Sequence, residues 1–425
     1  GGWFWGGGGR APPGGWGLGQ SKRGASLWVK MQPLWHALSL WSLGRPRARF
    51  RSVPLFSPPD FTLASLALAP DATFVAAAAD GVLPDGFFST TNLPTYVRIG
   101  GSWRLPREPR MDAGLVLDSE GVLWAREGRR VRKGDRVAIG AREDGAEGIF
   151  VHANAFKGDA AEGEFQFMSS EVSREKPIDY AQMAQLLLTE RDRGGYVVWV
   201  CGPALVHSRA RADMTWFIEN GFVGVMLAGN AVAVHDIEAS MFGTTLGMSG
   251  TGVATSGGHG LHMRAINQVR AAGSIAKAVE QGLVKNGIMH ACVRHGVPFV
   301  LCGSIRDDGP LPDVFVDTLA AQDAMRQHTR RSTMTIMVAT ALHAIAAGNM
   351  TPAYIEVADG TLRELPTICV DSSEFVVSKL KDRGTHQAFG VVTNAQDFMH
   401  ILRFFIEREL DARRALKAAT GAGAS

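Results

Sequence analysis

Polar side chains gather where a buried strand is expected to end. The segment LAGNAVAVHDIEASMFGTTLG, residues 227–247, begins apolar and then places Asn230, His235, Asp236 and Glu238 within nine residues. An imidazole beside carboxylates can take up and release protons, as general acid–base catalysis requires. Structural roles are equally compatible with the residues: Asn230 could cap the next helix, and Asp236 could be a solvated helix residue. A functional role is least expected for Glu238. For Asn230 and His235 the functional and the structural interpretation both stay open.

A second polar cluster follows another apolar run. The segment CGSIRDDGPLPDV, residues 302–314, contains Arg306, Asp307, Asp308 and Asp313, and two prolines stiffen it. Paired carboxylates beside an arginine could bind a substrate amine, or one of them could abstract a proton. The alternative is a salt-bridged turn. We favour a function because the cluster follows an expected strand.

Two segments nearer the amino terminus could add substrate contacts. STTNLPTYVR, residues 89–98, supplies Asn92 and Arg98, and FMSSEVSREKP, residues 167–177, supplies Glu171. Turn and capping chemistry would explain the same residues. Without further context, that interpretation is the simpler one.

Metal and disulfide chemistry are not expected. His259 and His262 form an isolated H-x-x-H, which is weak as a metal motif, so we predict no metal site. None of the four cysteines forms a C-x-x-C, and three lie in apolar strand-like runs; the four are Cys201, Cys292, Cys302 and Cys369. They are interpreted as buried free thiols, which favours a reducing compartment.

The elements that must position these residues follow from hydrophobic patterning. From about residue 178, continuous apolar runs alternate with helical patterns, which predicts a doubly wound α/β domain with a parallel sheet. The predicted strands are YVVWVC, VGVMLA, PFVLC, MTIMVA, TICV and AFGVV. The predicted helices are 178–193, 208–220, 261–281, 313–328, 372–382 and 395–412. Residues 60–165 instead show short apolar runs broken by Gly and Asp turns, typical of a β-rich module.

The carboxyl ends of the predicted strands are rich in small and polar residues. Ligands of open α/β sheets bind in the crevice outside these ends, so we predict a nucleotide site there. Its expected residues are Gly202, Pro203, Gly229, Asn230, Ala231, Ser304, Ile305, Thr340, Leu342 and Asp371. Asp371 could hold ribose hydroxyls, or it could cap the helix that follows. No G-x-G-x-x-G follows a strand, and the glycine-rich stretch 243–260 could be a lid or an ordinary loop.

Charge and composition divide the 425 residues further. Residues 1–59 contain eight Lys or Arg and no Asp or Glu, whereas the remainder carries 36 basic and 41 acidic side chains. We therefore expect a tail or presequence at 1–58, a β-rich domain at 59–165, the α/β domain at 166–415 and a flexible end at 416–425. The mildly acidic body does not indicate a nucleic-acid partner. The uncharged stretch 332–355 is interpreted as a buried strand and helix, not a membrane span, and a cytoplasmic location is expected unless the tail is an organellar presequence.

Several segments together resemble a known family. The sequence is similar to the archaeal and cyanobacterial-type ornithine cyclodeaminases, also called the LOR/SDH bifunctional enzyme conserved region. The matching segments, spread over about 79–400, are ADGVLPDGFFSTTNLPTYVR, FQFMSSEVSREKP, CGPALVHS, LAGNAVAVHDIEASMFGTTLG, GGHGLHMRAINQVRAAGSIAKAVEQGLVKNGIM, VPFVLCGSIRDDGPLPDV and GVVTNAQDF. The region before ADGVLP is shorter than in most members, which leaves the completeness of that subdomain open.

The resemblance implies a Rossmann-like NAD domain, akin to deoxyhypusine synthase, that converts L-ornithine to L-proline and ammonia with regenerated NAD. A homo-oligomer is also expected, and the arginine-degrading half of fused relatives has no counterpart in the sequence. In this reaction Arg306 or Arg98 would hold the substrate carboxylate, Asp307 and Asp308 its amines, and His235 or Asp236 would act as base. The alternatives are an NAD-dependent dehydrogenase of a lysine-pathway amino acid and a non-catalytic NAD- or amino-acid-binding regulator.

Overall fold

A computed structural model describes most of the chain from Phe56 to Gly421. The residues outside the description are 1–55, 92, 157–178, 250–252, 254–257, 308, 358–359, 384–387 and 422–425. The tail predicted for 1–58 therefore lies almost wholly outside the described residues, as do Asn92, Glu171, Asp308 and most of the glycine-rich stretch.

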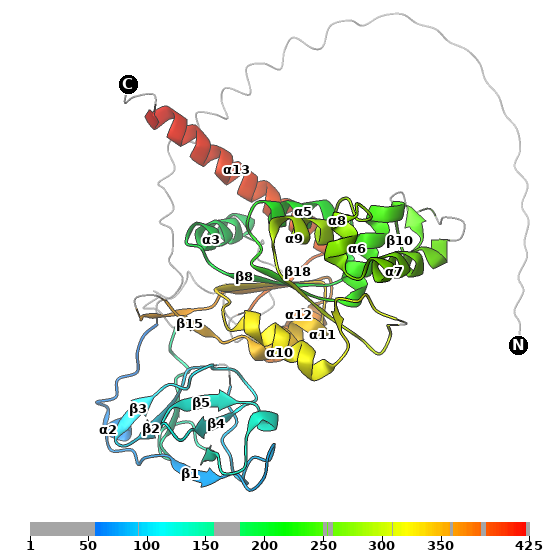
Figure 1. Ribbon diagram of the computed structural model, residues 1–425. Coiled ribbons are helices and arrows are strands. Elements are labelled where there is room, and N and C mark those ends of the chain that lie inside the picture. Colours follow the sequence, from blue (N-terminus) through cyan, green and yellow to red (C-terminus); the bar gives the residue numbers. More distant parts are fainter. Residues whose placement is uncertain are drawn as a thin grey trace, which may run out of the picture. The chain divides into compact units, whose positions relative to one another are not determined.

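A seven-stranded parallel sheet organises the carboxyl-terminal region (Figure 1). Its order is β13-β12-β9-β8-β14-β17-β18. The strands are β8 Val197–Cys201, β9 Val225–Gly229, β12 Phe299–Cys302, β13 Val314–Phe315, β14 Met334–Val338, β17 Thr367–Asp371 and β18 Ala388–Val392. Without the short β13, the strands follow the 3-2-1-4-5-6 order of a Rossmann fold, with the topological switch point between β8 and β14. The predicted α/β class and all six predicted strands are confirmed.

Helices cover both faces of this sheet (Figure 1). One layer contains α3 Tyr180–Asp192, α4 Ala204–His207, α5 Arg211–Glu219, α6 Asn230–Phe242, α7 Leu261–Ala272, α8 Ile275–Glu280, α9 Ile288–His295 and α13 Ala395–Gly421. The other contains α10 Thr318–Thr329, α11 Leu342–Met350 and α12 Glu374–Arg383. Strand β8 shows why both layers are needed: Trp199 and Cys201 pack in one core, and Val198 and Val200 in the other. Because alternate strand residues face opposite sides, an entirely apolar strand must be covered twice.

The amino-terminal region is β-rich, as predicted. One antiparallel sheet has the order β1-β6-β4-β5 and another the order β3-β2-β7. These strands are β1 Thr73–Ala76, β2 Thr95–Ile99, β3 Ser102–Arg104, β4 Gly114–Leu117, β5 Leu123–Arg126, β6 Arg136–Ile139 and β7 Ile149–Val151, with helix α2 at Ala64–Ala67 and a 3-10 turn at Gly128–Arg130. Val97, Leu115 and Ile149 are fully buried in its core.

Several short elements were not predicted from sequence. They are α4, α9, β13, the hairpin β10 Thr244–Thr245 with β11 Met248–Ser249, the 3-10 turn Gly258–Gly260, and the hairpin β15 Tyr354–Glu356 with β16 Leu362–Glu364. Helix α13 also continues to Gly421, past residue 415 where we expected the folded domain to end. Its last turns are held by ion pairs from Arg413 to Asp192 and Glu409.

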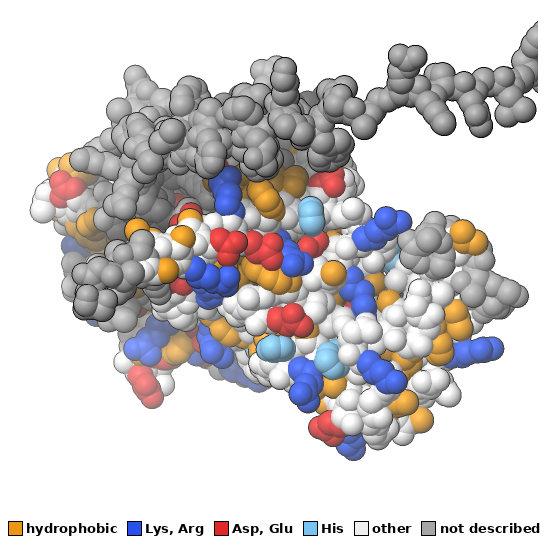
Figure 2. Space-filling view, turned by 90° about the horizontal axis from the view of Figure 1, so that it is seen from above, with side chains coloured by type: hydrophobic (Ala, Val, Ile, Leu, Met, Phe, Trp, Pro, Cys, Tyr) orange, Lys and Arg blue, Asp and Glu red, His pale blue; other side chains and the backbone are white. Residues whose placement is uncertain are grey.

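The uncharged stretch 332–355 forms β14 and α11, as interpreted from sequence. Among the described helices, none combines the length and apolar character needed to cross a membrane. All four cysteines are free and buried, as predicted. Figure 2 shows basic and acidic side chains interspersed over the described surface of the face in view.

Candidate functional site

A cavity of about 400 Å³ lies at the carboxyl ends of four neighbouring strands. Strand β8 contributes Cys201, β9 contributes Gly229, β12 contributes Cys302, and Thr340 follows β14. The volume falls within the ordinary range for small-molecule and cofactor sites. The cavity therefore occupies the crevice at the switch point, where the sequence predicted a ligand.

Close backbone packing shapes the floor of this cavity. A Cβ added to Gly202 would lie 1.7 Å from the carbonyl oxygen of Ala339, so glycine is required where β8 and β14 end side by side. A Cβ at Gly229 would lie 3.0 Å from Cε1 of His343. These glycines let the ends of β8 and β9 pack closely against the segments that follow β14.

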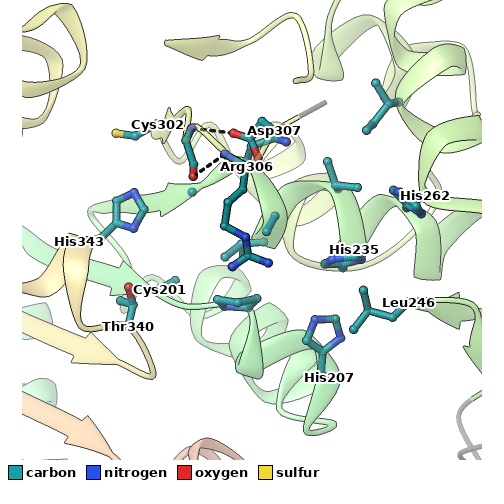
Figure 3. Close-up of a pocket in the computed structure, with 18 of the residues that line it drawn as sticks. Cys201, His207, His235, Leu246, His262, Cys302, Arg306, Asp307, Thr340 and His343 are labelled. Carbon is teal, nitrogen blue, oxygen red and sulfur yellow. Dashed lines mark hydrogen bonds between the residues drawn. The ribbon is translucent and has the colours of Figure 1, made fainter. Parts of the chain in front are cut away.

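Arg306 reaches into the cavity from the loop after β12. Figure 3 shows its side chain directed between His343 and Thr340 on one side and His235 and His207 on the other. No described side chain forms an ion pair with its guanidinium. A cation with open donors at this position suits a carboxylate or phosphate.

The loop that presents Arg306 is held by its own polar groups. Asp307 Oδ2 accepts a hydrogen bond from the amide of Ser304 at 2.7 Å, and Ser304 Oγ accepts one from the amide of Arg306 at 3.2 Å. Asp307 lines the cavity, and its Oδ1 is not used in this turn. Asp307 thus stabilises this turn through a backbone hydrogen bond rather than the salt bridge of the alternative, and it also lines the cavity.

Three imidazoles line the opposite wall. The rings of His207 and His235 are 4.7 Å apart between centroids, and those of His235 and His262 are 6.5 Å apart. Burial, together with neighbouring His235, lowers the pKa of His207. In the described parts of the chain, no group of three or more His, Cys, Asp or Glu side chains is placed to hold a metal ion.

His235 is bonded to Glu238 on the same face of α6. The Nδ1···Oε2 distance is 3.1 Å, and the spacing of three residues brings both side chains to one side of the helix. Glu238 Oε2 also accepts from the amide of Leu246 at 3.1 Å. Its Oε1 accepts from Thr244 Oγ1 at 3.0 Å and from the amide of Gly247 at 2.9 Å. Burial opposes ionisation of Glu238, but these hydrogen bonds hold its pKa below its usual range.

Asp236 points away from the cavity and acts as a structural anchor. Its carboxylate is fully buried and accepts from Arg211 Nε at 2.6 Å and from the amides of Ile288 and Met289 at 2.9 and 2.8 Å. The sequence alternative of a solvated helix residue is therefore wrong. Consecutive helix residues point about 100° apart, so His235 can face the cavity while Asp236 faces α5 and α9.

The predicted cofactor residues fall into two groups. Those that line the cavity are Pro203, Gly229, Asn230, Ala231, Ser304 and Thr340. Those that are not among its lining residues are Gly202, Ile305, Leu342 and Asp371. Asn230 does not cap α6; its Oδ1 accepts from the amide of Leu311 at 3.2 Å. Asp371 ends β17 and accepts from the amide of Ser373 at 2.9 Å, a local bond in the turn before α12, which begins at Glu374.

Two other sequence candidates have structural partners. Arg98 on β2 pairs with Asp71 at 3.3 Å and also donates to the carbonyl of Ala67, and it does not line the cavity. Asp313 accepts from the amide of Ile275 at 2.8 Å, which anchors the start of α8.

Sequence reasoning did not select His207 or His343 for the site. His207 belongs to the four-residue helix α4 directly after β8, and His343 to the first turn of α11, after β14. Their positions just past strand ends were the available signal. Burial lowers the pKa of His343 and raises that of the Cys302 thiol to about 11, so both groups are held neutral.

The fold and the cavity together define a Rossmann-fold protein with a ligand crevice at its switch point. The model of the ArgZ-like arginine dihydrolase C-terminal Rossmann fold matches residues 181–402, and the model of the first region of the same C-terminal part matches 94–181. The chain belongs to this ArgZ-like ornithine cyclodeaminase family.

Individual relatives agree with this assignment. The ornithine cyclodeaminase of Methanopyrus kandleri is 44% identical over 327 residues, which are 76% of this chain and 75% of the relative. The crystal structure of a conserved LOR/SDH protein from Methanococcus maripaludis matches with a TM-score of 0.72 and 40% identity, over 80% of this chain and 99% of that one. The ternary complex of AgrE with ornithine and NAD⁺ matches with a TM-score of 0.51 and 36% identity, over 81% of this chain and 47% of AgrE.

Proposed function

We propose that this protein is an ornithine cyclodeaminase that converts L-ornithine to L-proline and ammonia with catalytic NAD. The observation that carries the proposal is one cavity at the Rossmann switch point faced by both Arg306 and His235. The names of the relatives and the ligands of the AgrE complex support the substrate and the cofactor.

The residues at the strand ends fit NAD. Gly229, Pro203, Ala231 and Thr340 line the cavity and would lie along a bound dinucleotide. Asp371 remains our candidate for the ribose hydroxyls. When bound, NAD would supply the acceptor for the hydride of the α-carbon and afterwards the hydride that reduces the cyclic imine to proline, so it would be regenerated within one turnover.

The chain's own residues would bind ornithine and move its protons. Arg306 would hold the carboxylate with paired hydrogen bonds, and Asp307 Oδ1 would hold an ammonium group. His235 would take a proton from an amine, which must be neutral before its carbon is oxidised or before it can attack an imine. The δ-amine then adds to the α-imine carbon, and the α-nitrogen leaves as ammonia. Asp308 keeps its predicted role as a second amine ligand.

The test is proline formation from ornithine with NAD far below stoichiometric amounts. We expect many equivalents of proline per NAD and no accumulating NADH. One equivalent per NAD with matching NADH would instead favour the dehydrogenase alternative. Tight NAD binding without any turnover would favour a regulatory protein.

Replacing the guanidinium tests the substrate pose. Arg306→Ala should raise KM for ornithine by roughly 10–100-fold, because a charge-assisted hydrogen-bond pair is lost. Arg414→Ala is the matched control, since Arg414 is exposed on α13 and pairs only with Asp411 among the described side chains. An unchanged KM in a folded Arg306→Ala protein would remove Arg306 from the substrate site.

The proposal also includes an oligomeric state and a cellular location. They are the homo-oligomer and the cytoplasmic location. Light scattering of the purified protein measures the first, and fractionation of the source cells measures the second.

A further inference from the structure

Glu238 lies outside the cavity lining and yet controls one of its walls. Its side chain is fully buried, and it joins His235 on α6 to the backbone of the following hairpin. The proposed reaction assigns no step to this carboxylate. Its surroundings nevertheless decide which nitrogen of His235 can accept a proton.

The hydrogen-bond pattern determines the charge of Glu238. The amide of Leu246 donates to Oε2 and the amide of Gly247 donates to Oε1, and neither amide can accept. Each carboxyl oxygen must therefore be an acceptor. Three donors other than His235, the two amides and Thr244 Oγ1, converge on the two carboxyl oxygens and favour the ionised form, and the pKa of Glu238 is held below its usual range.

An ionised Glu238 in turn determines the tautomer of His235. A carboxylate only accepts, so the contact from Nδ1 to Oε2 at 3.1 Å requires the hydrogen on Nδ1. In the neutral ring, Nε2 is then the bare nitrogen. Since His235 lines the cavity, Nε2 is the nitrogen available to a substrate proton there.

The same carboxylate ties the ring to the base of the glycine-rich stretch. Gly247 has φ of +71°, and a Cβ there would lie 2.4 Å from the carbonyl carbon of Gly258. The backbone at Gly247 therefore packs closely against the backbone at Gly258, and the amide of Gly247 donates to Glu238. Leu246, whose amide also bonds to Glu238, itself lines the cavity. Glu238 therefore holds both the ring of His235 and the backbone at Leu246.

We infer that Glu238 is a positioning residue that fixes His235 as an Nε2 proton acceptor and holds the cavity wall at Leu246. The catalytic consequence rests on the proposed function, whereas the tautomer does not. The two can therefore fail separately.

The first experiment measures the tautomer directly. Long-range ¹H–¹⁵N correlation spectra of the ¹⁵N-histidine-labelled full chain, with the His235 signal assigned by its loss in His235→Asn, should show the Nδ1–H tautomer near pH 8. Glu238→Gln should shift His235 toward Nε2–H, because the Gln amide can donate to Nδ1. An Nε2–H tautomer in the wild type would overturn the inference and needs no variant that might unfold.

The second experiment measures the catalytic effect with a matched buried carboxylate. Glu238→Gln should lower kcat for ornithine by about 10²–10⁴-fold, as expected when a general base has the wrong tautomer, with NAD affinity changed less than about threefold. The control is Glu190→Gln, because Glu190 is equally buried but pairs with Arg363 away from the cavity.

Three outcomes separate the possibilities. A kcat within threefold of wild type in folded Glu238→Gln would overturn the inference. So would an equal loss in Glu190→Gln at a matched loss of stability, because the effect would then be general. If the wild type does not turn over ornithine, the proposed function is wrong. The tautomer spectrum would still test whether the hydrogen of His235 is on Nδ1.

Discussion

Helix α6 and the hairpin β15–β16 both bury carboxylates, but they surround them differently. Asp236 and Glu238 on α6 are 0% exposed, and Glu364 on β16 is 2% exposed. The carboxylates on α6 accept hydrogen bonds from amides and side chains on both oxygens. Neither oxygen of Glu364 has a hydrogen-bond partner among the described residues, and neither does the hydroxyl of Tyr354, which faces it across the hairpin.

The comparison shows that the number of hydrogen-bond donors around a buried carboxyl group, rather than its burial alone, determines whether it is charged. Burial raises the pKa of Glu364 to about 8, whereas four hydrogen bonds hold the pKa of Glu238 below its usual range against the same effect. Two acids of one residue type, equally hidden from water, are therefore expected in opposite protonation states at neutral pH. The following changes test that contrast.

The largest effect is expected at Asp236. Asp236→Ala should destabilise the protein by about 3–5 kcal/mol, because it leaves the Arg211 guanidinium and two buried amides without their acceptor. Urea unfolding followed by tryptophan fluorescence measures this change. Asp144→Ala, which breaks an exposed pair with Arg142, should change the free energy of unfolding far less. Equal losses in both variants would refute the anchoring role.

A pH-dependent effect is expected at Glu364. Between about pH 4.5 and 8 the folded state keeps a proton on Glu364 that the unfolded chain releases, so its contribution to stability is complete at low pH and is lost as the pH rises. Glu364→Gln cannot ionise and should gain roughly 2–4 kcal/mol relative to wild type between pH 5 and 8. The measurement is urea unfolding of both proteins across this range.

Glu238→Gln is the matched comparison for that pH series. Glu238 is ionised in both the folded and the unfolded state above about pH 5.5, since its folded pKa lies below the ordinary value. Its difference from wild type should stay nearly constant from pH 7 to 8, above the range in which histidines ordinarily titrate. A constant difference for Glu364→Gln as well would contradict the proposed contrast.

The smallest effect is expected at Thr244, one of the donors to Glu238. Thr244→Val keeps the shape of the side chain but removes a hydrogen bond of 3.0 Å to a carboxylate, so the free energy of unfolding should fall by about 1–2 kcal/mol. Thermal and urea unfolding at pH 7 give the change. Thr215→Val serves as control, because among the described residues its hydroxyl bonds only to the carbonyl of Arg211 in the same helix. Thr244→Val with unchanged stability would show that three donors suffice.

The sequence determined the α/β architecture and the location of the crevice. The predicted strands from β8 to β18 are almost entirely apolar, as expected for strands that are covered on both faces. Small residues such as Gly202 and Gly229 marked the strand ends because a parallel sheet brings those ends to one edge. The cavity was found at that edge.

Only the tertiary structure decided which polar residues face the cavity. His235 and Asp236 are neighbours in sequence, yet one lines the cavity and the other is buried against Arg211, because a helix turns about 100° per residue. The partners of Asp236 come from α5 and α9, far along the chain, and no local pattern encodes them. Hydrogen-bond donors for a buried acid are supplied by whichever segments pack around it, and for that physical reason the roles of Asp236, Glu238 and Glu364 were fixed by the fold.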